Sequence, residues 1–187
     1  MVDVRVQANS SEGKSSFYDT FSKVFSTWFW CGNSPYAPGT IGSIGALPLL
    51  PFALHNYAFG VVIFAVLLVL GWFTVRNYVA HRQVGCDPCE VVIDEVCGQL
   101  LTFMIPIILE KRGLVRLFPE NSYDMMSMPI FLCSGVIFFR VIDIVKPWPV
   151  CFVDKNVKGA LGIMCDDLLA AIPAAVLVLA VMNLKLI

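Results

Sequence analysis

The sequence has few charged residues for its length. Asp, Glu, Lys and Arg make up only 14% of its 187 residues, hydrophobic residues make up 58%, and the mean hydropathy is +0.77. A soluble domain carries about a quarter charged residues, and a chain this small has too little interior to bury such an apolar excess. A net charge of −1 with no basic run gives no support to a nucleic-acid partner. The composition therefore predicts a single-domain protein of the membrane.

Several catalytic and structural motifs are also missing. The seven cysteines are an odd number scattered along the chain, so they do not form a disulfide framework and are expected to be reduced. Cys86 and Cys89 have C-x-x-C spacing, but no second pair completes a zinc site. The two histidines, His55 and His81, lie outside the charged clusters, which disfavours a phosphohistidine mechanism. There is no cysteine-phosphatase loop, no D-x-D nucleophile and no P-loop.

Long apolar stretches predict the fold. No Asp, Glu, Lys or Arg occurs from Val24 to Val75, which is long enough for two membrane passes. The expected helices cover about 39–54, 57–75, 91–109, 128–147 and 167–184, with a charged connector at 110–127. The first is short and contains Pro48 and Pro51, so a re-entrant or kinked segment is the alternative. The predicted fold class is all-α, a polytopic membrane helix bundle of four to five short transmembrane helices.

The N-terminal region has a different composition. Residues 1–23 are polar and of mixed charge, with no signal-peptide pattern. They are expected to form a mobile tail that turns into an interfacial helix near Phe21–Trp30, where aromatic side chains would lie at headgroup level. The predicted organisation is a tail and interfacial helix at 1–30, followed by a membrane-embedded domain at 31–187.

Ionisable residues gather near one end of three predicted helices: Asp94 and Glu95; Arg140, Asp143 and Lys146; Asp166 and Asp167. A charge within the hydrocarbon costs at least a few kcal/mol, so such residues indicate function. Acids in a helix's first turn also cap free N–H groups. Capping would explain one acid, but not the whole set.

A topology of five passes with a cytoplasmic N-terminus brings all these clusters to one membrane face. That face would carry nine of the 13 lysines and arginines, in agreement with the positive-inside tendency, although Lys111 and Arg112 would lie opposite. Acidic clusters suit a hard cation such as magnesium, and the bases suit a phosphate. Metal-assisted attack of water on a phosphate is the predicted chemistry. A small membrane transporter or ion pathway is the alternative, but a pathway should carry polar groups through the full membrane depth.

Four sequence blocks together resemble one family. Residues 34–43 (SPYAPGTIGS) resemble the S-P-x-x-P-G-T-x-G-S opening of the phosphatidylglycerophosphatase A family, and 91–98 (VVIDEVCG) its V-x-D-E-x-x-G block. Residues 139–149 (FRVIDIVKPWP) resemble its F-R-x-x-D-x-x-K-P-W-P block, and 154–167 (DKNVKGALGIMCDD) its D-x-N-V-x-G-G-x-G-I-M-x-D-D block. Ala160 and Ala171 stand where the family often has glycine.

The resemblance implies magnesium-dependent removal of the terminal phosphate of phosphatidylglycerophosphate, giving phosphatidylglycerol in bacterial phospholipid synthesis. The site would face the cytoplasm at the inner membrane, and a phosphatase of another lipid phosphate stays open as an alternative; the sequence leaves the oligomeric state open. The resemblance implies catalytic carboxylates at Asp94, Glu95, Asp143, Asp166 and Asp167, all but Asp143 also being candidate metal ligands. It implies substrate contacts from Arg140, Lys146 and Lys158, and from Thr40 and Ser43; a glycine-eased turn explains those two hydroxyl residues equally well.

Overall fold

The computed structural model describes residues 12–82, 89–118 and 127–185, and in these ranges the chain forms helices and no strand. The all-α prediction is therefore confirmed. The elements are α1 (Glu12–Ser26), η1 (Cys31–Asn33), α2 (Pro38–Gly45), η2 (Leu47–Leu49), α3 (Leu50–His55), α4 (Tyr57–Arg82), α5 (Ile93–Lys111), α6 (Ser127–Val145), α7 (Val150–Asn156) and α8 (Ala160–Lys185).

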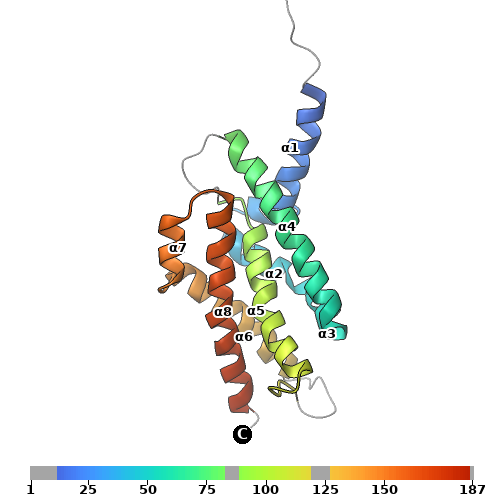
Figure 1. Cartoon of the computed structure of the whole chain (residues 1–187), viewed down its shortest axis with the longest axis vertical. Helices are drawn as coiled ribbons and strands as arrows, with labels where there is room; N and C mark the ends of the chain where they lie inside the picture. The colour runs from blue at the N-terminus through green and yellow to red at the C-terminus, as the bar shows by residue number, and fades with distance from the viewer. Residues whose placement is uncertain (1–11, 83–88, 119–126, 186–187) are drawn as a thin grey trace, which may run out of the picture.

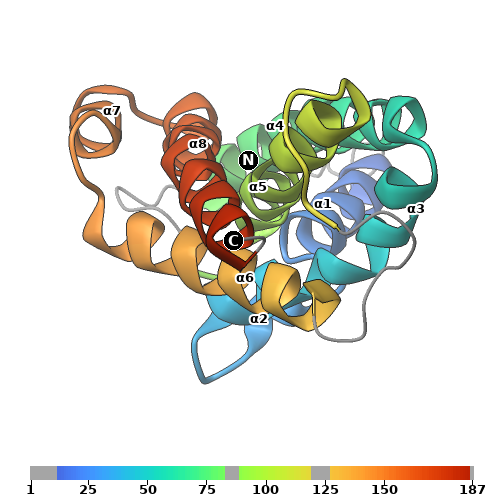
Figure 2. The ribbon, with the colours of Figure 1, turned by 90° about the horizontal axis from the view of Figure 1, so that it is seen from below.

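Helix α5 is the central element of the bundle. It packs against α8, α4, α6 and α2, and the views along and across the bundle agree on this central place (Figure 1, Figure 2). Its side chains Ile93, Val96, Leu100, Phe103 and Ile107 are almost completely buried. They recur at steps of three and four residues, and Cys97, Gln99, Thr102 and Met104 between them are buried too, so most of the helix circumference lies in the core.

Three helices of the described chain are long and apolar enough to cross a membrane: Tyr57–Ala80, Ser127–Val145 and Ala160–Leu184. Side chains such as Val62 and Val69 on α4 and Val176 on α8 are more than half exposed, although they are apolar. Lipid is the solvent that makes such a surface favourable. On the inner side of α8, Ala170, Ala174 and Ala175 are fully buried, and small residues of this kind let membrane helices approach closely. The finer expectation of four to five crossings is not confirmed by this count.

Several helix boundaries differ from those predicted. Segment 39–54 is not one helix: it divides into α2, η2 and α3, with Pro48 inside η2 and Pro51 near the start of α3, because a proline removes a helical N–H donor. Helix α1 begins at Glu12 rather than near Phe21. Helix α4 continues to Arg82, well past the predicted end at residue 75.

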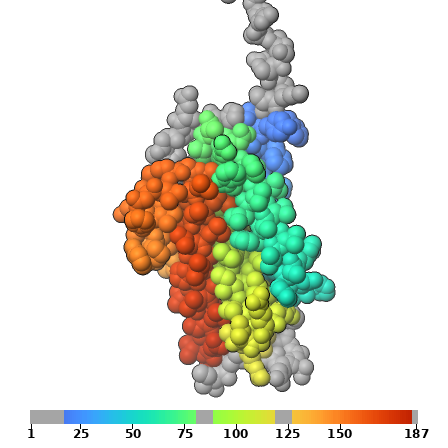
Figure 3. Space-filling model, in the orientation of Figure 1, coloured from blue at the N-terminus to red at the C-terminus, as the bar shows by residue number. Residues whose placement is uncertain are grey.

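The observed start of the C-terminal helix removes the capping explanation for Asp166 and Asp167. Helix α8 begins at Ala160 rather than at 167, so Asp166 and Asp167 lie in its second turn, where a capping role no longer applies. Asp94 and Glu95 do lie in the first turn of α5. The short helix α7 was not predicted, and it protrudes beside α8 on the molecular surface (Figure 3).

Three predictions concern residues outside the described ranges. These are the first part of the N-terminal tail (1–11), Cys86 of the C-x-x-C pair, and residues 119–126 of the charged connector. Cys89 is a free, exposed thiol.

Candidate active site

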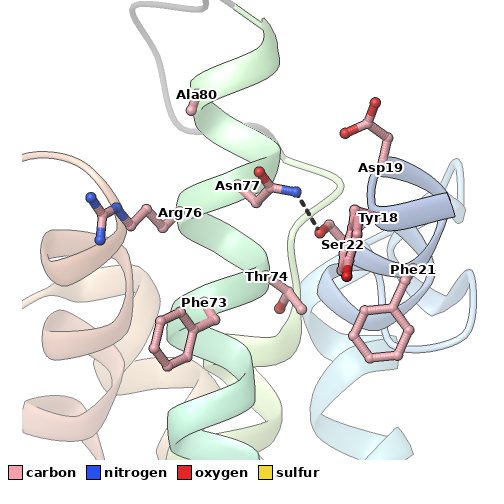
Figure 4. Close-up of a pocket in the computed structure, with 9 residues that line it drawn as sticks. All are labelled: Tyr18, Asp19, Phe21, Ser22, Phe73, Thr74, Arg76, Asn77 and Ala80. Carbon is pink, nitrogen blue, oxygen red and sulfur yellow. Dashed lines mark hydrogen bonds between the residues drawn. The ribbon is translucent and has the colours of Figure 1, made fainter. Parts of the chain in front are cut away.

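Of two hollows on the described part of the molecule, one holds the charged cluster. The larger, about 680 Å³, lies between α1 and α4; Asn77 there donates a hydrogen bond to Ser22 over 2.9 Å, and its lining carries only one acid, Asp19, and one base, Arg76 (Figure 4). The smaller, about 300 Å³, is lined by Ala37, Pro38, Gly39, Cys89, Val91, Asp94, Glu95, Arg140, Asp143, Lys146, Ile163, Asp166 and Asp167. We call the smaller hollow the carboxylate pocket. Size alone favours the larger hollow, but the concentration of ionisable groups makes the carboxylate pocket the candidate active site.

Close helix packing brings the acids of the carboxylate pocket together. At Gly98 on α5, an added Cβ would lie 2.6 Å from the Phe139 ring on α6 and 3.0 Å from the carbonyl oxygen of Asp167 on α8. Only a residue without a side chain fits at that distance. Because Gly98 lies one turn after Asp94 and Glu95, this approach places the acids of α5 beside those of α8.

Asp94, Glu95 and Asp167 form a three-carboxylate group whose ligand oxygens lie within 4.8 Å of one another. One oxygen of each carboxylate, namely Asp94 Oδ1, Glu95 Oε2 and Asp167 Oδ2, is buried and accepts no hydrogen bond from the residues that the structure describes. Buried acceptors without partners are unfavourable, and three converging carboxylates repel one another, which a bound cation would relieve. The donor set consists of oxygens alone, which suits a hard divalent cation.

Arg140 supplies positive charge to the same pocket. Its Nη1 lies 2.9 Å from Asp143 Oδ2, one turn further along α6, and 3.7 Å from Glu95 Oε1. Gly39, in the first turn of α2, lies directly against this pair: an added Cβ would be 2.7 Å from Arg140 Nη2 and would also overlap Glu95 Oε1. Gly39 therefore makes room for the Glu95 and Arg140 side chains.

Lys146 lies at the rim of the pocket, immediately after α6, with a left-handed backbone φ of 46°. Its Nζ donates one hydrogen bond to Asp154 on α7 and one to Asp166 on α8, each with a donor–acceptor distance of 2.5 Å. Partial burial by itself lowers the pKa of Lys146, but the hydrogen bonds to these two carboxylates outweigh it and raise that pKa above its usual range. The Lys146 hydrogen bond in turn lowers the pKa of Asp154.

Seven of the ten predicted site residues line the pocket, and three do not. The seven are Asp94, Glu95, Arg140, Asp143, Lys146, Asp166 and Asp167. Thr40 and Ser43 are absent from its lining, and the buried Ser43 hydroxyl donates to the Gly39 carbonyl over 3.0 Å. Lys158 is exposed in the turn before α8.

Two acidic side chains meet at Lys146. Asp166, predicted as a metal ligand, is engaged by Lys146 and lies outside the three-carboxylate group. Asp154, which contacts the site through Lys146, was missed. Its only signal in the sequence was its place at the start of the 154–167 block.

The two alanines at family glycine positions fit the structure. Gly159 takes the positive φ of 73° in the turn before α8, and Ala160 is the first helical residue, so a second glycine is not needed there. Ala171 is fully buried in a cluster with Val150 of α7.

Known proteins resemble this chain over most of its length. Residues 24–182 match the family described as Phosphatidylglycerophosphatase A. The protein of that name from Escherichia coli is 30% identical over 157 residues, which cover 79% of this chain and 75% of the relative. The Haemophilus influenzae protein of the same name is 27% identical, covering 78% of each chain. A Bacteroides thetaiotaomicron protein named putative phosphatidylinositol-3-phosphatase is 28% identical, covering 83% of this chain and 89% of its own. No solved structure matches. The chain belongs to the phosphatidylglycerophosphatase A family.

Proposed function

We propose that this protein hydrolyses the terminal phosphate of phosphatidylglycerophosphate, with magnesium, to give phosphatidylglycerol and inorganic phosphate. The observation that carries the proposal is the three-carboxylate group, with its unpartnered oxygens, in one pocket with Arg140 and Lys146. Cation ligands and phosphate-binding bases side by side are what metal-assisted phosphoryl transfer requires.

Each part of the pocket has a role in this reaction. Asp94, Glu95 and Asp167 would hold the magnesium, which when bound neutralises phosphate charge and lowers the pKa of a coordinated water. Arg140 and Lys146 bind the phosphate oxygens, and Asp143 and Asp166 hold these two bases in place through their ion pairs. Water attacks phosphorus, the bond from phosphorus to the glycerol oxygen breaks, and a pocket carboxylate accepts a proton from the water and passes it to the departing glycerol oxygen.

The surroundings of the pocket suit a lipid substrate. The pocket lies where α5 and α8 begin and α6 ends, and Trp148 and Phe152, in the segment from α6 through α7, are more than half exposed. Exposed aromatic rings of this kind lie at the headgroup level of a bilayer. A volume of about 300 Å³ admits a phosphorylated headgroup while the acyl chains stay in the membrane.

The proposed setting is the inner membrane of a bacterium, with the pocket facing the cytoplasm, in phospholipid synthesis. Helix α5 is our proposed fourth crossing: its 19 residues span about 28 Å at 1.5 Å per residue. Its acids lie at its ends, Asp94 and Glu95 at one and Glu110 at the other.

Two other functions make different predictions. An ion pathway requires ionisable groups through the membrane depth, whereas those of the carboxylate pocket gather at one end of the bundle. A phosphatase of another lipid phosphate has the same residue chemistry, and the name of the Bacteroides relative makes phosphatidylinositol 3-phosphate the substrate to compare.

The test is phosphate release by the purified protein in detergent micelles, with and without magnesium, from phosphatidylglycerophosphate and from phosphatidylinositol 3-phosphate. Asp167→Asn removes one carboxylate of the three-carboxylate group; Glu110→Gln, at the opposite end of α5, is the matched neutral control. We expect magnesium-dependent release that Asp167→Asn reduces at least 100-fold and Glu110→Gln leaves unchanged. Faster release from phosphatidylinositol 3-phosphate would overturn the proposed substrate. A folded protein that hydrolyses neither lipid would overturn the proposed function.

A further inference from the structure

Helix α7 carries a carboxylate beside the pocket that neither the chemistry above nor the family name assigns. Asp154 lies in the last turn of α7 and contacts Lys146 Nζ, which also contacts Asp166 of α8. Lys146 thus bridges two carboxylates that come from two different helices. Asp154 itself is absent from the pocket lining, and its hydrogen bond to Lys146 connects it to the pocket.

The Lys146 ammonium needs both carboxylates to hold its position. A lysine side chain is a flexible four-carbon stem that ends in a point charge, and this side chain is 30% exposed. Its backbone has left α6 in a left-handed conformation, so the stem is not held on a face of that helix. A single bond to Asp166 leaves the ammonium free to swing about that carboxylate, and a second bond from the other side removes this freedom.

The position of Asp154 is itself determined by packing. At the start of α7, Val150 is 1% exposed and is buried with Ala170, Ala171 and Ala174 of α8. This contact seats α7 beside α8, where Figures 1 and 3 show it. Four residues later, one turn along α7, Asp154 faces the same neighbour.

We propose that Asp154 is a positioning residue that holds the Lys146 ammonium at the rim of the carboxylate pocket, where it receives the phosphate of the substrate. That this phosphate belongs to the lipid substrate rests on the proposed function. It assigns a role to α7: the helix seats a carboxylate that orients a phosphate-binding base.

A double-mutant cycle separates positioning from a general structural effect. The variants are Asp154→Asn, Lys146→Met and their combination; Asp154→Glu keeps the charge, and Glu110→Gln is the control for removing a carboxylate elsewhere. We expect Asp154→Asn to raise KM for the lipid phosphate about tenfold while kcat changes less than about threefold. We expect Asp154→Glu to restore most of the loss. In the Lys146→Met background, Asp154→Asn should have no further effect.

Binding of inorganic phosphate to the same folded variants, measured by calorimetry in magnesium, decides the inference independently of turnover. Phosphate affinity that falls about tenfold in Asp154→Asn, but not in the Lys146→Met background, supports the positioning role even if the protein hydrolyses neither lipid. Losses that add in the combined variant, or an Asp154→Asn protein that binds phosphate as the unmodified protein does, overturn it. Lack of lipid hydrolysis with intact coupling would overturn the proposed function alone.

Discussion

Replacing Gly39 by alanine should greatly slow turnover without unfolding the protein. Gly39 lies in the first turn of α2, where alanine is a better helix former by up to about 1 kcal/mol. The added methyl group would lie 2.7 Å from Arg140 Nη2 and 2.9 Å from Nη1, whereas carbon and polar atoms in ordinary contact are separated by at least about 3.4 Å. Arg140 must therefore move by about 0.7 Å or more, and Glu95, overlapped by the same methyl group, must move with it.

A displacement of that size matters for catalysis more than for stability. Misplacing a catalytic group by about 1 Å costs on the order of 100-fold in rate, and both displaced groups belong to the pocket. The matched control is Gly45→Ala at the other end of α2, where the added Cβ would lie 2.8 Å from the Trp28 ring. That change overpacks the core by about 1–3 kcal/mol without touching the pocket.

The assay measures kcat/KM on phosphatidylglycerophosphate together with the midpoint of thermal unfolding. We expect Gly39→Ala to lose about 100-fold in kcat/KM with an unchanged midpoint, and Gly45→Ala to lower the midpoint with kcat retained. A Gly39→Ala protein within threefold of the unmodified activity would refute the inferred contact between α2 and the Glu95–Arg140 pair.

Three further predictions concern other parts of the molecule. Arg140→Lys keeps the charge but loses the planar fork that binds two oxygens, so KM should rise about tenfold; an unchanged KM would exclude phosphate contact by Arg140. The lowered pKa of Asp154 means that its ion pair stabilises the fold above the pKa of the unfolded chain and is lost as pH falls through the folded value. The raised pKa of Lys146 means that the same pair is retained until alkaline pH. The midpoint temperature of thermal unfolding should therefore fall when the pH is lowered below about 4. A series of melting curves at different pH should show a smaller fall for Asp154→Asn. In the core, a Cβ at Gly135 would overlap the Phe103 ring, so Gly135→Ala should cost about 1–3 kcal/mol in chemical denaturation; no loss would mean that α5 and α6 pack less closely.

The membrane character and most of the helices were readable from the sequence alone. Lipid-facing helices must satisfy their own backbone and present apolar side chains, so hydropathy alone located α4, α5, α6 and the body of α8. The charged residues were equally visible, because Asp, Glu, Arg and Lys beside such helices have few structural explanations. That Asp94 and Asp167 line one pocket agrees with the expectation that the acidic clusters meet at one end of the bundle.

Helix boundaries and short elements were predicted less well, since their cause is tertiary. Helix α7 has only seven residues, too few to be stable alone, and it depends on the packing of Val150 against α8. The start of α8 at Ala160 likewise follows from the turn at Gly159 rather than from the apolar pattern that begins near residue 167.

The pairing of individual acids and bases was decided by the tertiary structure alone. The sequence presents Asp166 and Asp167 as one pair, but neighbouring residues on a helix point about 100° apart. In the fold Asp167 joins Asp94 and Glu95, whereas Asp166 turns to Lys146 and, through it, to Asp154. Local sequence determines which residues are present at the end of each helix, but the distance at which two helices approach determines which of them meet, and here that distance depends on the missing side chain of Gly98.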